Sequence, residues 1–241
     1  MSHVLLRSSP STVRLCLGAA FALAGADLKI FFNSMNGQST QVDHREREEQ
    51  NTSPGHPLKG SWTFWVSVRG DQSRDHEECV KKWRTVDTAQ QFFEFYNIIP
   101  RPSQLDSDYD LCLFRKGIEP HWESKDNAAG GRWTVFLLKS RENQKETLDL
   151  YWIWLLVTLI GEWFGDVGGE ICGANVRVRD DVDKVSLWTR NGSNVSAVKK
   201  IGAIFKERLR VETCDKVKYR MHNYRPPTKP TIARTRRFYE C

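Results

Sequence analysis

The chain contains two kinds of segment, one in which apolar residues recur at every second position and one in which they recur at helical spacing. From Ser61 to Arg69 they occupy every second position, which is typical of a strand with one buried face. Similar runs predict further strands at Asp110–Phe114, Trp133–Leu138, Ile171–Arg179, Lys184–Thr189 and Lys216–Met221. Short links between strands, such as residues 180–183 between Ile171–Arg179 and Lys184–Thr189, favour antiparallel pairing. We therefore expect a mostly antiparallel sheet.

Three other segments have helical periodicity. Thr88 followed by Gln91 predicts a capping box, and the helix that it starts should end before Pro100. The segment Lys145–Phe164 is the longest, and its centre is almost continuously apolar but too short to span a bilayer. Ser193–Leu209 has its apolar residues on one face. Strands interleaved with three helices predict an α+β domain with the helices packed on one face of the sheet.

The composition narrows the functional classes. The chain has 241 residues, of which 39% are hydrophobic and 27% charged, as in an ordinary globular protein. Its formal net charge is +6, but residues 210–241 hold nine Lys/Arg against three Asp/Glu and account for all of it. This distribution argues against a uniformly basic surface that coats a nucleic-acid duplex. Nine tryptophans, all in the middle of the chain, are the feature to explain.

The first 55 residues allow two interpretations. The apolar run 15–24 follows Arg7 and Arg14 and resembles a secretory signal. In the second interpretation, which we favour, Met35 is the true start and residues 1–34 are an upstream extension. We predict a disordered N-terminal extension over 1–55, a folded domain over 56–221 and a basic C-terminal tail over 222–241.

The six cysteines form no CxxC pair and have no zinc-ligand spacing with a histidine. We expect reduced thiols, with Cys112 and Cys172 buried in apolar runs. We expect neither a metal nor a cofactor. Nucleophile-elbow and Walker motifs are also absent from the sequence, which predicts a binding protein and not an enzyme.

Near the centre of the chain, a turn places an aromatic residue beside a carboxylate. In Gly117–Glu123, Pro120 precedes His121, Trp122 and Glu123. The face of an exposed indole attracts positive charge, and a neighbouring carboxylate accepts N–H groups. The pair suits a flat cationic ligand that also donates hydrogen bonds, although a simple half-buried tryptophan is the alternative.

This segment, followed by Gly130–Trp133, resembles the signature of the eukaryotic translation initiation factor 4E family, which binds the 5′ cap of messenger RNA. Four further motifs match in the same order: His56–Leu58 before Trp62 and Trp65, Ile160–Glu162, Cys172–Ala174 and Lys206–Leu209. The likeness therefore runs from His56 to Leu209. The resemblance implies a curved antiparallel sheet, three helices on its convex face and a cap slot on its concave face. It also implies a cytoplasmic and nuclear location, without a membrane.

In this family the charged 7-methylguanine ring lies between two tryptophans. The resemblance assigns one of these places to Trp122, the edge-reading carboxylate to Glu123 and the residue near the methyl group to Trp188. It assigns the phosphate contacts to Arg132, Arg179 and Lys184. Two positions depart from the pattern, because His76 falls where the other sandwiching tryptophan is expected and Asp181 falls where a basic residue is common. Trp83, at the head of a strand, is expected in the core rather than as a substitute platform.

The resemblance also implies a partner surface on the convex side. There the family binds a helical peptide with a Tyr and a following Leu, carried by the scaffold initiation factor 4G and by repressor proteins. The matching positions in this chain are His56, Pro57, Ala89, Phe93, Ile153, Trp154 and Gly161. For Phe93 and Ile153, a plain role in the core is an equally good interpretation.

Two functional hypotheses follow. In the first, the protein binds the 7-methylguanosine cap and contributes to translation initiation through a scaffold partner. In the alternative, it is a weak or cap-incompetent member that represses translation or sequesters partners. We interpret His121 and His222 as solvated loop residues and not as ligands. We interpret Asp180, Asp181 and Asp183 as part of a turn between strands. A secreted protein on the same scaffold is a third, weaker possibility.

Overall fold

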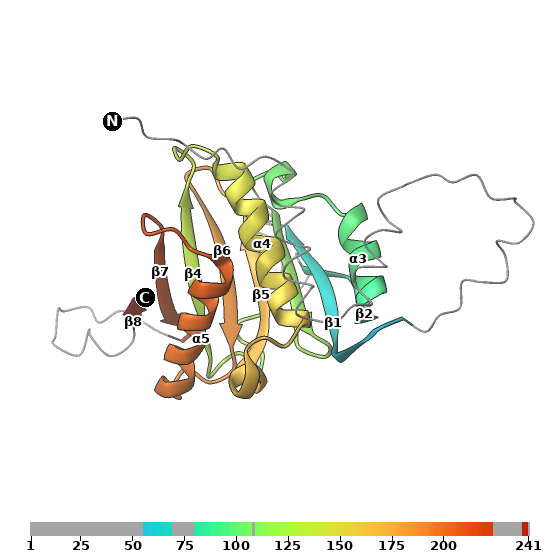
Figure 1. Ribbon diagram of the computed structural model, residues 1–241. Coiled ribbons are helices and arrows are strands. Elements are labelled where there is room, and N and C mark those ends of the chain that lie inside the picture. Colours follow the sequence, from blue (N-terminus) through green and yellow to red (C-terminus); the bar gives the residue numbers. More distant parts are fainter. Residues whose placement is uncertain (1–54, 69–79, 108, 224–237, 241) are drawn as a thin grey trace, which may run out of the picture. The chain divides into compact units, whose positions relative to one another are not determined.

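The computed structural model describes residues 55–68, 80–107, 109–223 and 238–240 (Figure 1). The predictions for the N-terminal extension, for His76 and for most of the C-terminal tail lie outside these residues. The described residues form one eight-stranded sheet with α-helices packed on it. Within them, no helix combines the length and the apolar character needed to cross a membrane.

The sheet has the strand order β2-β1-β3-β5-β6-β4-β7-β8, and each neighbouring pair is antiparallel. This confirms the predicted α+β class with its antiparallel sheet. β8 pairs with β7 although it lies in the segment predicted as a tail. The strands are β1 (Pro57–Val68), β2 (Val80–Thr88), β3 (Tyr109–Arg115), β4 (Gly131–Leu138), β5 (Ile171–Arg177), β6 (Val182–Thr189), β7 (Lys216–Met221) and β8 (Phe238–Glu240).

The described helices are α3 (Ala89–Ile98), α4 (Gln144–Ile160) and α5 (Val195–Leu209), with short 3-10 turns η2 (Pro102–Gln104) and η3 (Gly165–Glu170). At the start of α3 the Thr88 hydroxyl accepts a hydrogen bond from the Gln91 N–H at 3.2 Å, as the capping box predicts. The Gln91 side chain, however, accepts from the N–H of Asp87 at 3.0 Å and not from that of Thr88.

Helix α4 ends four residues earlier than its apolar pattern predicts. Its C-cap is Gly161, and the next residue, Glu162, has a positive φ of 54°. Gly165, with a φ of 58°, adds a second left-handed residue before η3 begins. Left-handed conformations end a helix even where the sequence stays apolar, so Phe164 packs in the core from outside the helix.

Alternation along the strands gives the sheet two chemically different faces. The helix face, covered by the α-helices in Figure 1, buries large aromatic side chains that include Trp62, Phe64 and Trp133. The Trp133 indole donates a hydrogen bond to the Val198 carbonyl of α5 at 2.8 Å. A Cβ on Gly202 of the same helix would lie 2.3 Å from this ring, so only glycine permits so close an approach.

Trp83 does not belong to the core, contrary to the prediction. It is 39% exposed, and its ring meets Phe95 of α3 edge-on with 6.1 Å between centroids. Because Phe95 also contacts Phe64, Trp83 lies on the helix face of the sheet. The backbone would have to turn over before this indole could serve a ligand on the opposite face.

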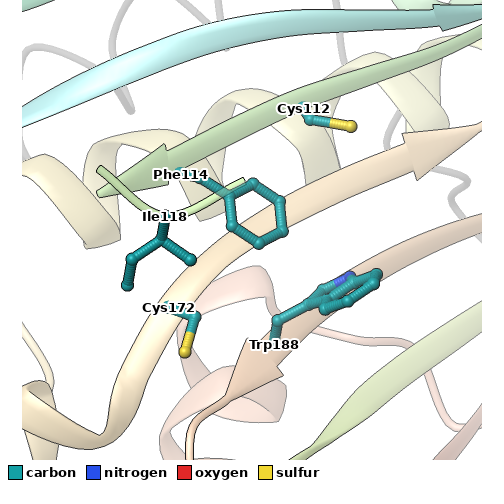
Figure 2. Packing of buried hydrophobic residues seen from close by; sticks show 5 residues of the cluster. All are labelled: Cys112, Phe114, Ile118, Cys172 and Trp188. Carbon is teal, nitrogen blue, oxygen red and sulfur yellow. The ribbon is translucent and has the colours of Figure 1, made fainter. Parts of the chain in front are cut away.

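The opposite face, which we call the pocket face, has an apolar centre and a charged surround. Figure 2 shows the apolar centre, a cluster of Cys112, Phe114, Ile118, Cys172 and Trp188. Both cysteines are buried, which confirms the prediction, and burial raises the pKa of each thiol. The charged residues of the neighbouring strands lie around this cluster on the same face of the sheet.

Candidate functional site

A pocket of about 380 Å³ lies on the pocket face. Its walls include two tryptophans, three arginines and one acidic residue, which come from β3, β4, β5, β6, β7 and the loop after β3: Trp122, Trp188, Arg132, Arg177, Arg220 and Asp110. The structure thus brings together predicted residues that are up to 66 positions apart, counted from Trp122 to Trp188. Aromatic rings beside clustered cations suit a ligand with a flat base and several phosphates.

Trp188 is the rigid wall of the pocket. Its side chain is only 3% exposed, and its indole donates a hydrogen bond to the Asn175 side chain at 2.7 Å. Phe114 packs edge-on against the ring with 5.4 Å between centroids (Figure 2). The guanidinium of Arg132 lies over the same ring, 5.7 Å from its centroid. These contacts fix the orientation of Trp188 before any ligand enters.

Trp122 is the exposed wall of the pocket. It is 44% exposed, which is unusual for so large an apolar side chain. Its loop is held from inside by the fully buried amide of Asn127, which donates to the carbonyls of Glu119 and His121, each at 2.8 Å. The turn therefore presents an aromatic face to solvent on a hydrogen-bonded base, and this arrangement favours the binding interpretation over a half-buried structural tryptophan.

Glu123 sits next to Trp122 with an exposed carboxylate. Its Oε2 lies 3.7 Å from Nε2 of His121, and the Glu123 N–H donates to Nδ1 of the same ring at 3.3 Å. The His121 ring also stacks over Trp122 with 6.5 Å between centroids. His121 lies in a loop, as predicted, but it is only partly exposed and contacts both predicted site residues.

Asp110 organises the cations at one end of the pocket. It is 5% exposed, and its carboxylate pairs with the guanidinium groups of both Arg177 and Arg179, each at 2.8 Å. Arg179 was a predicted phosphate contact, whereas Arg177 was not recognised. Because both oxygens of Asp110 are engaged, the two arginines are held in position but share a single negative charge.

Arg132 and Lys184 complete the predicted cation set. Burial, and then the nearby positive charges of Arg177 and Arg220, lower the pKa of Arg132 to about 10. Burial and the neighbours Arg177, Arg132 and Arg179 also lower the pKa of Lys184. Each group therefore sits in a positive field, which an anionic ligand would relieve.

The loop that carries Arg179 is anchored by a buried acid. Asp183 is fully buried in β6, where it accepts hydrogen bonds from the Arg179 N–H at 2.9 Å, from the Lys139 ammonium at 2.8 Å and from the Gln144 amide. Asp180 and Asp181 lie in the predicted turn, but Asp183 is a buried residue of strand β6. Asp181 is exposed at the tip of this turn.

His222 was expected to be a solvated loop residue, and this expectation was wrong. Its ring packs on Trp188 with 4.3 Å between centroids and lines the pocket. Burial, and then the positive charges of Arg132 and Arg177, lower its pKa to about 3. The imidazole is therefore neutral at physiological pH and behaves as an apolar wall.

The predicted partner residues lie in, or directly next to, β1, α3 and α4. The Ala89 N–H donates to the His56 carbonyl at 2.9 Å, and the His56 N–H donates to the Gln90 side chain at 2.8 Å. Phe93 and Ile153 are each only 7% exposed, so both contribute mainly to the core. Pro57 is exposed and Trp154 is half-buried, so both remain accessible. The Arg210 guanidinium lies over the Trp154 ring, 6.0 Å from its centroid. Gly161 is exposed at the end of α4.

Sequence reasoning missed Asp110, Arg177, Arg220 and His222. The first three share a signal that was available, because each is a charged residue inside an alternating strand. That pattern places them on the polar face of their strands but does not say which strands are neighbours. Only the register, which pairs Arg132 with Arg220 and Arg177 with Asp110, brings them to one pocket.

Comparison with known proteins agrees with the resemblance seen in the sequence. The family model described as eukaryotic initiation factor 4E matches residues 57–236. Initiation factor 4E-3 of Caenorhabditis elegans is 37% identical over 168 residues, which cover 69% of this chain and 66% of the relative. Human initiation factor 4E is 34% identical over 191 residues, which cover 78% of this chain and 87% of the relative.

Solved structures extend the comparison to ligands. Ascaris suum eIF4E-3 in complex with the m2,2,7G cap is 40% identical, with a TM-score of 0.67 over 74% of this chain and 97% of that chain. C. elegans eIF4E-3 in complex with the 4E-binding protein Mextli is 37% identical, with a TM-score of 0.65 over 69% of this chain and 93% of that chain.

The half-buried His222 predicts a dependence of stability on pH. Its pKa is about 3 in the folded protein, against about 6.5 in an unfolded chain. Between these values the unfolded state binds the extra proton, so stability falls as the pH drops from about 6.5 towards 3. The contribution of this residue is at most about 1.4 kcal/mol per pH unit. Urea unfolding from pH 7 to pH 4 should therefore give a steeper loss for the wild type than for His222→Gln. Equal slopes would contradict the lowered pKa of this imidazole.

Proposed function

Because the chain belongs to the eukaryotic initiation factor 4E family, we propose that its pocket binds the 7-methylguanosine 5′ cap of messenger RNA and that it serves translation initiation through a scaffold partner. The observation that carries the proposal is the joining of Trp122, Trp188 and an arginine cluster in one pocket. We assign the cap-binding domain to residues 56–221. The role is one of binding, without catalysis, and its place is the cytoplasm, with access to the nucleus.

The aromatic residues would recognise the base. Methylation at N7 makes guanine cationic, and a cation is attracted to the face of an indole. Trp122 offers such a face, while the buried Trp188 offers a fixed wall for the methyl group. The neighbouring Glu123 carboxylate would accept the N–H groups on the Watson–Crick edge of the base. Unmethylated guanine lacks the positive charge and would bind more weakly.

The cations would hold the triphosphate. Arg132, Arg179 and Lys184 are the proposed phosphate contacts, and the pKa of Arg132 and that of Lys184 are lowered by burial and then by neighbouring positive charge. Asp110 keeps Arg179 in position through the 2.8 Å ion pair. This arrangement supports cap binding over the cap-incompetent alternative, since Trp122, Trp188 and Arg132 all line the described pocket.

The helix face would bind the protein partner. The Mextli complex of the C. elegans relative supports a 4E-binding partner for this chain as well. We propose that a helical peptide with a Tyr and a following Leu contacts His56, Pro57 and Ala89 at one end and Trp154 and Gly161 of α4 at the other. Phe93 and Ile153 would support this surface from the core, where both are 7% exposed.

Titration with m7GTP, followed by tryptophan fluorescence, tests cap binding. We expect quenching by m7GTP and a much weaker response to GTP. Replacing Trp122 with Ala removes one stacking platform, worth about 1–3 kcal/mol, and should weaken binding by about 5- to 150-fold. Glu123→Gln should also weaken it, because the carboxylate loses its charge.

Trp83→Ala is the matched control for this titration, because Trp83 is an exposed tryptophan on the helix face. Its dissociation constant for m7GTP should equal that of the wild type. A wild-type protein that shows no quenching at millimolar m7GTP, or that responds equally to GTP, would refute the proposal.

A second prediction concerns His76, which the resemblance places where a sandwiching tryptophan is expected. His76→Trp should tighten m7GTP binding by about tenfold, because an indole is a larger platform than an imidazole. Wild-type binding should weaken below about pH 6.5, where a charged imidazole repels the cationic base. If the substitution leaves both the affinity and its pH profile unchanged, His76 is not the platform.

The partner surface is tested with a labelled Tyr-x-x-x-x-Leu peptide and fluorescence anisotropy. Trp154→Ala removes half-buried apolar area from α4 and should weaken peptide binding by about tenfold. Leu138→Ala, which removes an exposed apolar side chain at the end of β4, should leave the affinity as in the wild type. Equal affinities for all three proteins would place the peptide elsewhere.

A further inference from the structure

We propose that the protein partner of this chain carries acidic side chains next to its Tyr-Leu helix, and that two arginines at the end of α5 bind them. The two guanidinium groups lie over two tryptophans, and we call the four residues the Trp–Arg surface: Trp154, Trp163, Arg208 and Arg210. The inference rests on the proposed partner surface and adds the charge of the partner that this surface selects.

Each half of the Trp–Arg surface joins two segments of the chain. Arg210, the C-cap of α5, lies over Trp154 of α4 with 6.0 Å between the guanidinium carbon and the ring centroid. Arg208, in the last turn of α5, lies over Trp163 at 5.2 Å. Both tryptophans are half-buried and both arginines are exposed. Because α4 and α5 pack side by side (Figure 1), the end of α5 brings both cations to the surface of α4.

The Trp–Arg surface is continuous with the proposed partner surface. Trp154 belongs to both, and Gly161 follows it by seven residues, so the two positions lie on one face of the helix about 10 Å apart. The Trp163 ring lies directly beside Gly161, because a Cβ added to this glycine would be 2.8 Å from the indole nitrogen. A peptide that contacts Trp154 and Gly161 would therefore also reach the two arginines.

The two guanidinium groups lack an acidic partner in the part of the chain that the structure describes. Neither Arg208 nor Arg210 forms an ion pair there. Residues 150–161, which include most of α4, contain no charged side chain. Glu162, which follows, is engaged by Arg115 at 3.1 Å. The surface thus offers positive charge that an acidic partner would complement.

Helix α5 is basic as a whole. It holds one acid, Glu207, against four cations: Lys199, Lys200, Lys206 and Arg208. Cations in the last turn of a helix also interact favourably with the helix dipole. That local role does not require either guanidinium to lie over a tryptophan of another segment, as both do here. The placement over the indoles therefore indicates a further role in binding.

The chemistry of the Trp–Arg surface suits carboxylates on a peptide. The attraction between a guanidinium and an indole face holds the long arginine side chain in place before a partner arrives. The N–H groups at the rim of the guanidinium stay free to donate two parallel hydrogen bonds to one carboxylate. The apolar stretch 150–161 beside the arginines favours a peptide over a nucleic acid, whose affinity comes from many phosphate contacts. Glu or Asp residues next to an apolar helix would use both parts of the surface.

The test uses three fluorescent peptides with the full chain. They share one Tyr-x-x-x-x-Leu core and differ only in the two residues on each side of it, which are Glu, Gln or Lys. The variant is Arg208→Gln with Arg210→Gln. Its matched control is Lys145→Gln with Lys199→Gln, the same change of charge at exposed positions on α4 and α5. Anisotropy gives the dissociation constants, and circular dichroism melting checks that each variant is folded.

We expect the wild type to bind the Glu peptide about fivefold more tightly than the Gln peptide, because two exposed ion pairs form, and the Lys peptide more weakly still. The preference should shrink as salt is added. The Arg208→Gln, Arg210→Gln variant should bind the Glu and Gln peptides equally, while the control pair keeps the fivefold preference. Arg208→Glu with Arg210→Glu should prefer the Lys peptide, a reversal that neither misfolding nor a lost helix-dipole interaction would produce.

The outcomes separate this inference from the proposed partner surface. If the Gln peptide binds and is weakened by Trp154→Ala, but the Glu peptide binds no more tightly or keeps its advantage in the Arg208→Gln, Arg210→Gln variant, the acidic partner is wrong and the partner surface stands. If no peptide binds the wild type, both proposals are wrong. A short uncapped RNA that displaces the Glu peptide as well as the unlabelled peptide does would assign the Trp–Arg surface to nucleic acid and overturn the inference.

Discussion

The alternation of side chains across one antiparallel sheet is the constraint from which the other features follow. Residues such as Trp133 and Tyr219 turn to the helix face and are fully buried there. Their neighbours Arg132 and Arg220 must then point to the opposite face, because the period of a strand is two. The same backbone thus builds an aromatic core and a cationic pocket, and a slip of one residue would exchange them.

The cations of the pocket are held together at an electrostatic cost. Asp110 offsets part of this cost by pairing with Arg177 and Arg179, while burial and mutual repulsion lower the pKa of Arg132 to about 10. Positive charge that is preorganised in this way needs little rearrangement when a polyanion binds. The neutral His222 and the apolar cluster that includes Trp188 add uncharged surface beside these cations.

The two tryptophan walls differ in how they are supported. Trp188 is fixed by the sheet, through Asn175 and Phe114, and is 3% exposed. Trp122 stands on a loop and is 44% exposed, but the buried amide of Asn127 ties that loop to its own carbonyls. A fixed wall and a more accessible one suit a flat ligand that must enter between them. The proposed partner surface on α3 and α4 lies on the opposite face of the sheet from the pocket, so the proposed cap and peptide would not compete for one site.

Local sequence determined much of this protein. Periodicity located most strands and the helices, the Thr88 cap marked the start of α3, and short motifs identified Trp122, Trp188 and Arg132 at the pocket. These features depend on neighbours in the chain. Tertiary structure alone decided the pairing of Arg220 with Arg132, the packing of His222 against Trp188 and the exposure of Trp83. Strand order and register bring distant residues together, and no local pattern encodes which strands will be neighbours.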